Sequence, residues 1–338
     1  MEYAINTKKF TVKVWPVNSL IAVIYGLILA SLPNDWFRDR DNYIIYAKNL
    51  DVVFDRYDYL SFFFNEPLFI LYNKLLSNFA SPEIIPKLGV FFISSTIVYF
   101  ILKYSKNWLA AVIGLFLLFF VSYTFHLQLV AIRQGVATAL LLWVVHFYGN
   151  KNIFYVFCFL LSFFHISFIV ISFLLLFDLL LEKLIKDLKI RMLLFLFVIF
   201  CSSLILLNVA SFLGVRQASS DHLTTNNFGH GGFLLFLFVG FFFWLRGLNN
   251  VYRNVFGKIS FLGVLVYLGF YYTIPISGRI IGTFLPFFYV YFVSEFRKKT
   301  AIAAVVFLLV NLIIFQDSIK GGSLTYEGVQ ALEYSIID

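Results

Sequence analysis

Residues 153–181 read IFYVFCFLLSFFHISFIVISFLLLFDLLL, an apolar run with His165 near its middle. A transmembrane helix needs about 20 apolar residues, so this run is long for one helix and short for two. A single crossing would place the basic residues of 182–191 on the outer side, against the preference of lysine and arginine for the cytoplasm. The sequence therefore predicts two short or re-entrant helices that meet at His165 near the outer face.

The rest of the chain has the composition of a membrane protein. Of its 338 residues, 61% are hydrophobic and 13% are charged, and the mean hydropathy is +0.88, far outside the range of a soluble domain. We expect an all-α, polytopic membrane protein with about 11 transmembrane helices. The apolar segments lie at residues 17–33, 83–102, 108–125, 131–148, 153–165, 166–181, 192–211, 232–246, 259–274, 280–295 and 301–316.

The basic residues predict the orientation of the chain. Lys8, Lys9 and Lys13 precede the first apolar segment, which places the N-terminus in the cytoplasm. With eleven crossings, most of the 26 basic residues then lie inside, so the net charge of +8 indicates topology and not nucleic-acid binding. We expect one integral membrane domain over residues 1–338, with an external loop and an interfacial helix at 34–82.

Six polar residues fall at or near helix ends on the predicted outer side. They are Arg38, Arg40, Glu66, Arg133, His165 and Arg279. An arginine in an apolar segment is costly unless it faces a cavity or reaches the interface, and reaching the interface explains Arg133 or Arg279 taken singly. Two such arginines at one depth predict a clamp for phosphate, because the planar guanidinium binds oxyanions through paired hydrogen bonds.

The histidine and the acids are candidate proton acceptors. His165 suits this role because an imidazole side chain titrates close to neutral pH. Glu66 is the second candidate, and Asp39 and Asp41 rank after these two. The alternatives are a histidine that is satisfied within the core and a glutamate that caps a helix beginning at Pro67.

Aromatic residues of the external loop are candidates for sugar binding. Trp36, Tyr43, Tyr46 and Tyr57 alternate with charged residues in this loop. The pattern suits a sugar, whose apolar face stacks on a ring while its hydroxyl groups bind charged side chains. An ordinary solvated loop with an interfacial aromatic belt is the alternative.

We expect neither a metal nor another cofactor. Asp221, His222 and His230 match no strong metal-site spacing, and Cys158 and Cys201 both lie within apolar segments, where no disulfide scaffold is implied. Nothing in the chain resembles a phosphate-binding Walker loop or a dinucleotide fingerprint. Nucleotide-driven transport is therefore not predicted.

Several short motifs occur in an order that resembles one family. They are RDRDNY at 38–43, Glu66-Pro67, AIRQGVATAL at 131–140, FFHIS at 163–167 and Gly278-Arg279. Together they are similar to the EpsG-like family of membrane exopolysaccharide and O-antigen polymerases, the Wzy-type enzymes. The resemblance covers residues 17–300.

This resemblance implies a bacterial inner-membrane glycosyltransferase of the GT-C-like kind that uses no metal. It implies undecaprenyl-diphosphate-linked oligosaccharide repeats as donor and acceptor, joined into O-antigen, capsule or exopolysaccharide on the periplasmic or outer face. Arg133 and Arg279, with Arg38 or Arg40 as a third cation, would stabilise the leaving diphosphate. Membrane lipid is an expected partner and nucleic acid is not. Whether a protein that regulates chain length is also a partner stays open.

Two other functions stay open at this point. A glycan ligase would use the same cations and a similar base, with only the acceptor changed. A lipid-linked saccharide flippase or transporter would need ionisable groups at mid-membrane. The charges within the apolar segments instead lie near the ends of those segments, which favours the enzyme.

Overall fold

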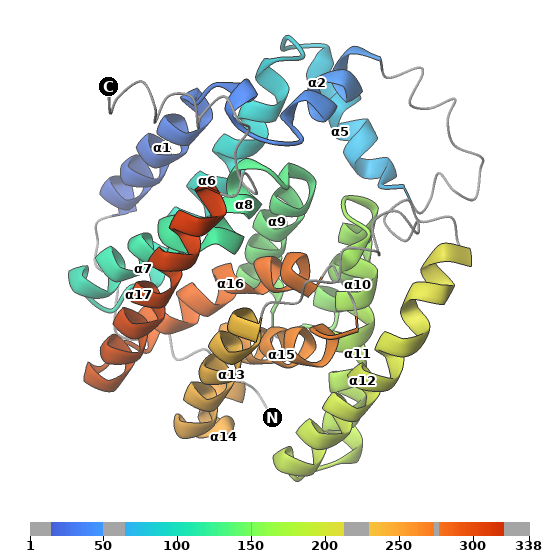
Figure 1. Cartoon of the computed structure of the whole chain (residues 1–338), viewed down its shortest axis with the longest axis vertical. Coiled ribbons are helices and arrows are strands. Elements are labelled where there is room, and N and C mark those ends of the chain that lie inside the picture. Colours follow the sequence, from blue (N-terminus) through green and yellow to red (C-terminus); the bar gives the residue numbers. More distant parts are fainter. Residues whose placement is uncertain (1–14, 50–64, 150, 213–229, 274–276, 321–338) are drawn as a thin grey trace. The chain divides into compact units, whose positions relative to one another are not determined.

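The computed structural model is all-helical over the residues it describes, which are 15–49, 65–149, 151–212, 230–273 and 277–320 (Figure 1). The α-helices are α1 (Trp15–Ser31), α2 (Arg40–Lys48), α5 (Pro67–Ser77), α6 (Ile84–Tyr104), α7 (Trp108–Phe120), α8 (Ser122–Leu129), α9 (Ile132–Tyr148), α10 (Ile153–Leu160), α11 (Ser167–Leu184), α12 (Leu188–Phe212), α13 (His230–Leu245), α14 (Leu248–Tyr252), α15 (Val255–Phe270), α16 (Ser277–Ser294) and α17 (Lys298–Lys320). Two 3-10 helices, η1 (Asn34–Trp36) and η2 (Leu161–Phe163), complete the set. The all-α prediction is confirmed for these residues.

Each predicted apolar segment overlaps a helix, but 108–125 is not one continuous helix. That segment is divided into α7 and α8, which meet at a bend of 73°. In the described ranges, Ile84–Tyr104 and Thr300–Lys320 are long and apolar enough to cross a membrane, and the α7–α8 pair is a third such element if it counts as one span. Five shorter apolar helices accompany them, as expected of a polytopic membrane protein.

The break predicted at His165 is confirmed. Helix α10 and η2 end at Phe163, and α11 begins at Ser167, so His165 lies in the short connection between them. The helix predicted to begin at Pro67 is present as α5. These two positions bring the candidate acid and the candidate histidine to helix ends.

The described chain divides into two compact units, called here the first and the second unit. The first contains residues 65–69 and the described part of 143–288, and the second contains 15–49, 70–142 and 289–320. The boundaries fall within α5, α9 and α16. The expectation of one membrane domain stays a prediction.

In the second unit, a glycine lets two helices pack closely, and polar side chains bind a carbonyl group that is freed at a helix break. Gly26 of α1 lies so close to α6 that an added Cβ would stand 3.0 Å from the Phe91 carbonyl oxygen. At the α7–α8 bend, the Leu118 carbonyl accepts hydrogen bonds from Thr124 Oγ1 at 3.0 Å and Gln128 Nε2 at 3.2 Å. A broken helix in an apolar environment needs such partners, because freed backbone groups find no water there.

In the first unit, α15 is buried along most of its length and packs against α12, α13 and α14. Gly263 lies against the Phe284 ring of α16, and Gly269 lies against Ile199 of α12. A side chain at either glycine would overlap its neighbour, so both positions depend on the missing Cβ. The contacts of α15 thus hold α12 and α14, which carry Arg191 and Tyr252.

Candidate functional site

A buried acid–histidine pair lies in the first unit. His165 Nδ1 and Glu66 Oε1 are 2.5 Å apart, and the two residues are only 5% and 4% exposed. The amide of Ile166 also donates to Glu66 Oε1, at 3.3 Å. With Glu66 ionised and the imidazole neutral, the carboxylate only accepts, so His165 Nδ1 carries the donated proton and Nε2 is left as an acceptor. The structure thus brings together the two leading candidates for the base.

The backbone at Glu66 is held in an unusual conformation. Glu66 has φ +63° and Asp39 has φ +66°, and among the described residues they are the non-glycine positions with positive φ. A left-handed backbone at such residues costs about 1–3 kcal/mol and persists where the surroundings enforce it, often at functional sites. Both strained positions are acids that the sequence analysis selected.

A cation–aromatic contact lies in the second unit, between α9 and α2. The Arg133 guanidinium, in the first turn of α9, lies 5.8 Å from the centre of the Tyr43 ring and 6.0 Å from that of Tyr46. Tyr43 is 4% exposed, whereas Arg133 and Tyr46 are half-buried. Arg133 is therefore held beside two of the residues predicted to bind sugar.

Arg40 is a fully buried cation in the same unit. Its Nε donates to the Leu129 carbonyl at 2.9 Å, and Nη1 donates to Asn34 Oδ1 at 3.0 Å. Its guanidinium lies 4.7 Å from the centre of the Phe37 ring. Within the part of the chain that the structure describes, Nη2 has no hydrogen-bond partner and no carboxylate pairs with Arg40. Burial lowers the pKa of Arg40 to about 10, so the group stays charged at pH 7. A buried charge without a counter-ion is costly, which makes this nitrogen a candidate contact for an anion.

The other sequence candidates are more open. Arg38, Asp39 and Asp41 are exposed at the start of α2, and Trp36 is half-buried in η1. The Asp39 carboxylate accepts a hydrogen bond from Asn42 at 3.4 Å. No candidate base in this group has the buried partner that His165 has.

Arg279 is exposed in the first turn of α16, in the first unit. Because Arg133 belongs to the second unit, the clamp formed by these two arginines stays a prediction. Tyr57, Asp221 and His222 lie outside the described residues, and His230 begins α13. The described ranges contain no group of three His, Cys, Asp or Glu side chains placed to hold a metal ion.

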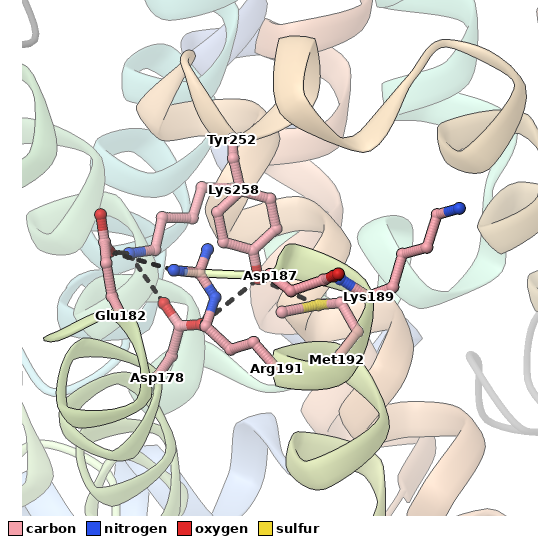
Figure 2. A network of polar contacts seen from close by, with 8 residues as sticks. All are labelled: Asp178, Glu182, Asp187, Lys189, Arg191, Met192, Tyr252 and Lys258. Atoms are coloured by element: carbon pink, nitrogen blue, oxygen red, sulfur yellow. Dashed lines mark hydrogen bonds and ion pairs between the residues drawn. The ribbon is translucent and has the colours of Figure 1, made fainter. Parts of the chain in front are cut away.

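A second polar cluster, which the sequence analysis missed, joins four helices of the first unit (Figure 2). Lys258 of α15 places its Nζ 2.7 Å from Asp178 Oδ2 and 2.9 Å from Glu182 Oε2, both on α11. The Tyr252 hydroxyl of α14 donates to Asp178 Oδ1 at 3.3 Å and contacts Met192 Sδ of α12 at 3.2 Å. Burial and the Asp178 carboxylate raise the pKa of Tyr252, so its hydroxyl remains a donor.

Arg191 of α12 completes this cluster more loosely. Its Nε is 3.8 Å from Asp178 Oδ1, its Nη1 is 4.0 Å from Glu182 Oε2, and its guanidinium lies 4.6 Å from the centre of the Tyr252 ring. Two acids and two cations balance in charge, so the cluster links α11 to α12, α14 and α15 and offers no surplus charge to a ligand. The signal in the sequence was the pair of acids four residues apart on an apolar helix, since both would lie on one face and need cations there.

Comparison with known proteins gives one finding. The model of the EpsG family matches residues 17–325, nearly the whole chain. No curated protein and no solved structure matches.

Proposed function

The chain belongs to the EpsG family, and on that premise we propose that it joins undecaprenyl-diphosphate-linked oligosaccharide repeats into a surface polysaccharide. The family supports a polysaccharide polymerase-like role. The observation that carries the specific proposal is the buried Glu66–His165 pair at 2.5 Å. Such a pair is suited to removing a proton from a hydroxyl group, because a fixed carboxylate orients the ring and stabilises the charge that the ring acquires.

In the proposed reaction, an acceptor hydroxyl attacks the anomeric carbon of the donor glycan. The new C–O bond forms as the bond from that carbon to the diphosphate oxygen breaks, and the diphosphate leaves with the electron pair. The hydroxyl proton passes to His165 Nε2. Arg133 and Arg279, with Arg38 or Arg40 as the third cation, offset the charge that develops on the diphosphate.

The geometry favours His165 as the proton acceptor and Glu66 as its orienting partner. Glu66 Oε1 is already occupied by His165 Nδ1 and the Ile166 amide. His165 Nε2 makes no hydrogen bond with any described residue. Asp39 and Asp41 remain reserve candidates, because neither is coupled to a buried ring.

The remaining parts of the proposal follow the family and the hydropathy pattern. We place about 11 crossings of a GT-C-like fold in the bacterial inner membrane, with the N-terminus in the cytoplasm and the site on the periplasmic or outer face. Trp36, Tyr46 and Tyr57 are proposed to stack on sugar. Tyr43 belongs to the same set of candidates but is largely buried. Membrane lipid surrounds the chain, and a chain-length regulator is a further proposed partner.

Chain extension by the purified protein tests this function. Incubated in detergent with lipid-diphosphate repeat units, the protein is expected to produce a ladder of glycans that differ by one repeat. Gel or mass analysis of the products provides the measurement, and His165→Ala serves as the matched control. A flippase or transporter would give no ladder, and a ligase would transfer glycan to a different lipid without extending it.

The pH dependence of the rate distinguishes the two members of the pair. Loss of a general base lowers the rate by about 10²–10⁴-fold, so His165→Ala is expected to fall into this range and to lose the acidic limb of the pH–rate profile. Glu66→Gln should slow the reaction but retain that limb, because the amide still accepts from Nδ1. Retention of the limb in His165→Ala and its loss in Glu66→Gln would reverse the two roles.

A further inference from the structure

One face of α2 makes three contacts with the break that precedes α9. Arg40 and Tyr43 are three residues apart, as are Tyr43 and Tyr46, so successive members of this series lie near one another on the helix surface. Arg40 contacts the end of α8, and the two tyrosines contact Arg133 at the start of α9. A single short helix therefore contacts both sides of the same break.

The Arg40 contact lies at the break between α8 and α9. Helix α8 ends at Leu129 and α9 begins at Ile132. In an unbroken helix the Leu129 carbonyl would be the partner of the Arg133 amide, four residues on. Here the Leu129 carbonyl accepts from Arg40 Nε at 2.9 Å, which stabilises the interruption and with it the backbone from which Arg133 projects.

The two rings restrict the Arg133 side chain. A free arginine loses up to about 2 kcal/mol of rotamer entropy when it is fixed, and a cation over an aromatic face recovers about 0.5–2 kcal/mol. Tyr43 is 4% exposed, so its ring offers little open surface for a sugar to cover. Its ring is in contact with the Arg133 guanidinium, among other neighbours.

Helix α2 is itself anchored at both ends. At its last turn, Lys48 Nζ forms an ion pair with Glu83 Oε1 at 2.9 Å, at the start of α6. Before its first turn, Asn34 donates to the Glu83 carbonyl at 2.9 Å and accepts from Arg40 Nη1 at 3.0 Å. The support for Arg133 therefore comes from an element that is tied to α6.

We propose that Tyr43 and Tyr46 are positioning residues, which hold the Arg133 guanidinium in the orientation that binds the diphosphate of the lipid-linked substrate. This inference rests on the proposed function, because it takes Arg133 to be a diphosphate contact. It gives the two tyrosines a role toward the cation, beside the proposed stacking of Tyr46 on sugar.

The test measures binding of undecaprenyl diphosphate to the full-length protein in detergent, so no turnover is required. Tyr43→Phe keeps the ring and is expected to bind as the wild type does. Tyr43→Leu removes it and should weaken binding about five-fold, as the loss of a cation–aromatic contact predicts. Tyr46→Leu, at a half-buried position, should act in the same direction and serves as the second variant if Tyr43→Leu does not fold.

The decisive comparison repeats Tyr43→Leu and Tyr46→Leu in an Arg133→Gln background. If the rings act through Arg133, neither substitution weakens binding further there. An equal loss in both backgrounds overturns the inference and leaves the proposed function intact. If Arg133→Gln alone binds as tightly as the wild type, the cation assignment within the proposed function fails, and the inference fails with it.

Discussion

Lys258→Met is expected to destabilise the protein by about 3–5 kcal/mol, because it removes the cation from a buried ion cluster. Lys258 Nζ lies 2.7 Å from Asp178 and 2.9 Å from Glu182. Asp178 is fully buried, so without Lys258 its charge keeps only the looser contact with Arg191 and the hydroxyl of Tyr252. The measurement is the unfolding transition of the detergent-solubilised protein, followed by loss of helical circular dichroism.

Lys189→Met is the matched control for this variant. Lys189 is exposed on α12 and points away from the cluster in Figure 2, so its loss should change stability by less than about 0.5 kcal/mol. Removing an acid as well, in Lys258→Met with Asp178→Asn, should recover part of the lost stability. Equal transitions for Lys258→Met and Lys189→Met would show that the cluster contributes nothing to stability.

Arg133→Ala is expected to lower chain extension by at least about 10²-fold while the protein still inserts into the membrane. The reason is that, in the proposed reaction, a guanidinium beside the diphosphate would stabilise charge that develops only as the bond to the anomeric carbon breaks. The measurement is the initial rate of ladder formation at saturating donor. Arg279→Ala is expected to behave in the same way, as the second member of the proposed clamp.

Arg253→Ala provides a control for the loss of an arginine as such. Arg253 is exposed between α14 and α15 and has no proposed contact with substrate, so its variant should extend chains at the wild-type rate. Expression and membrane insertion are compared for all three variants by the yield in the membrane fraction. A near-normal rate for Arg133→Ala would remove this residue from the proposed mechanism.

The sequence predicted the helices that depend on local composition and missed those that depend on distant contacts. Apolar length and the basic residues that follow placed a break at His165, because 29 residues fit neither one span nor two and a single span would export residues 182–191. The bend between α7 and α8 was not predicted. It is stabilised by Thr124 and Gln128, whose side chains bind a carbonyl freed at the bend. Helix α2 lies in what hydropathy showed only as a polar loop.

The candidate site was predictable in its residue types but not in its pairings. Glu66 and His165 were selected because an acid and an imidazole at helix ends suit proton transfer. Their contact spans 99 residues of sequence, a separation that no local pattern encodes. The same holds for Arg40 and the Leu129 carbonyl, which lie 89 residues apart. The Asp178 cluster was missed because the charged residues were used only to decide which side of the membrane each loop occupies. Ion pairs between them were not considered.

Helix α11 connects the two polar groups of the first unit. His165 precedes its first residue, and Asp178 lies eleven residues beyond that residue, roughly 16 Å along the axis. A genetic screen that scored only polysaccharide on the cell surface would therefore group Asp178 and Lys258 with His165, since misfolding and lost chemistry yield the same phenotype. Protein abundance, recorded for every mutant, separates the two classes.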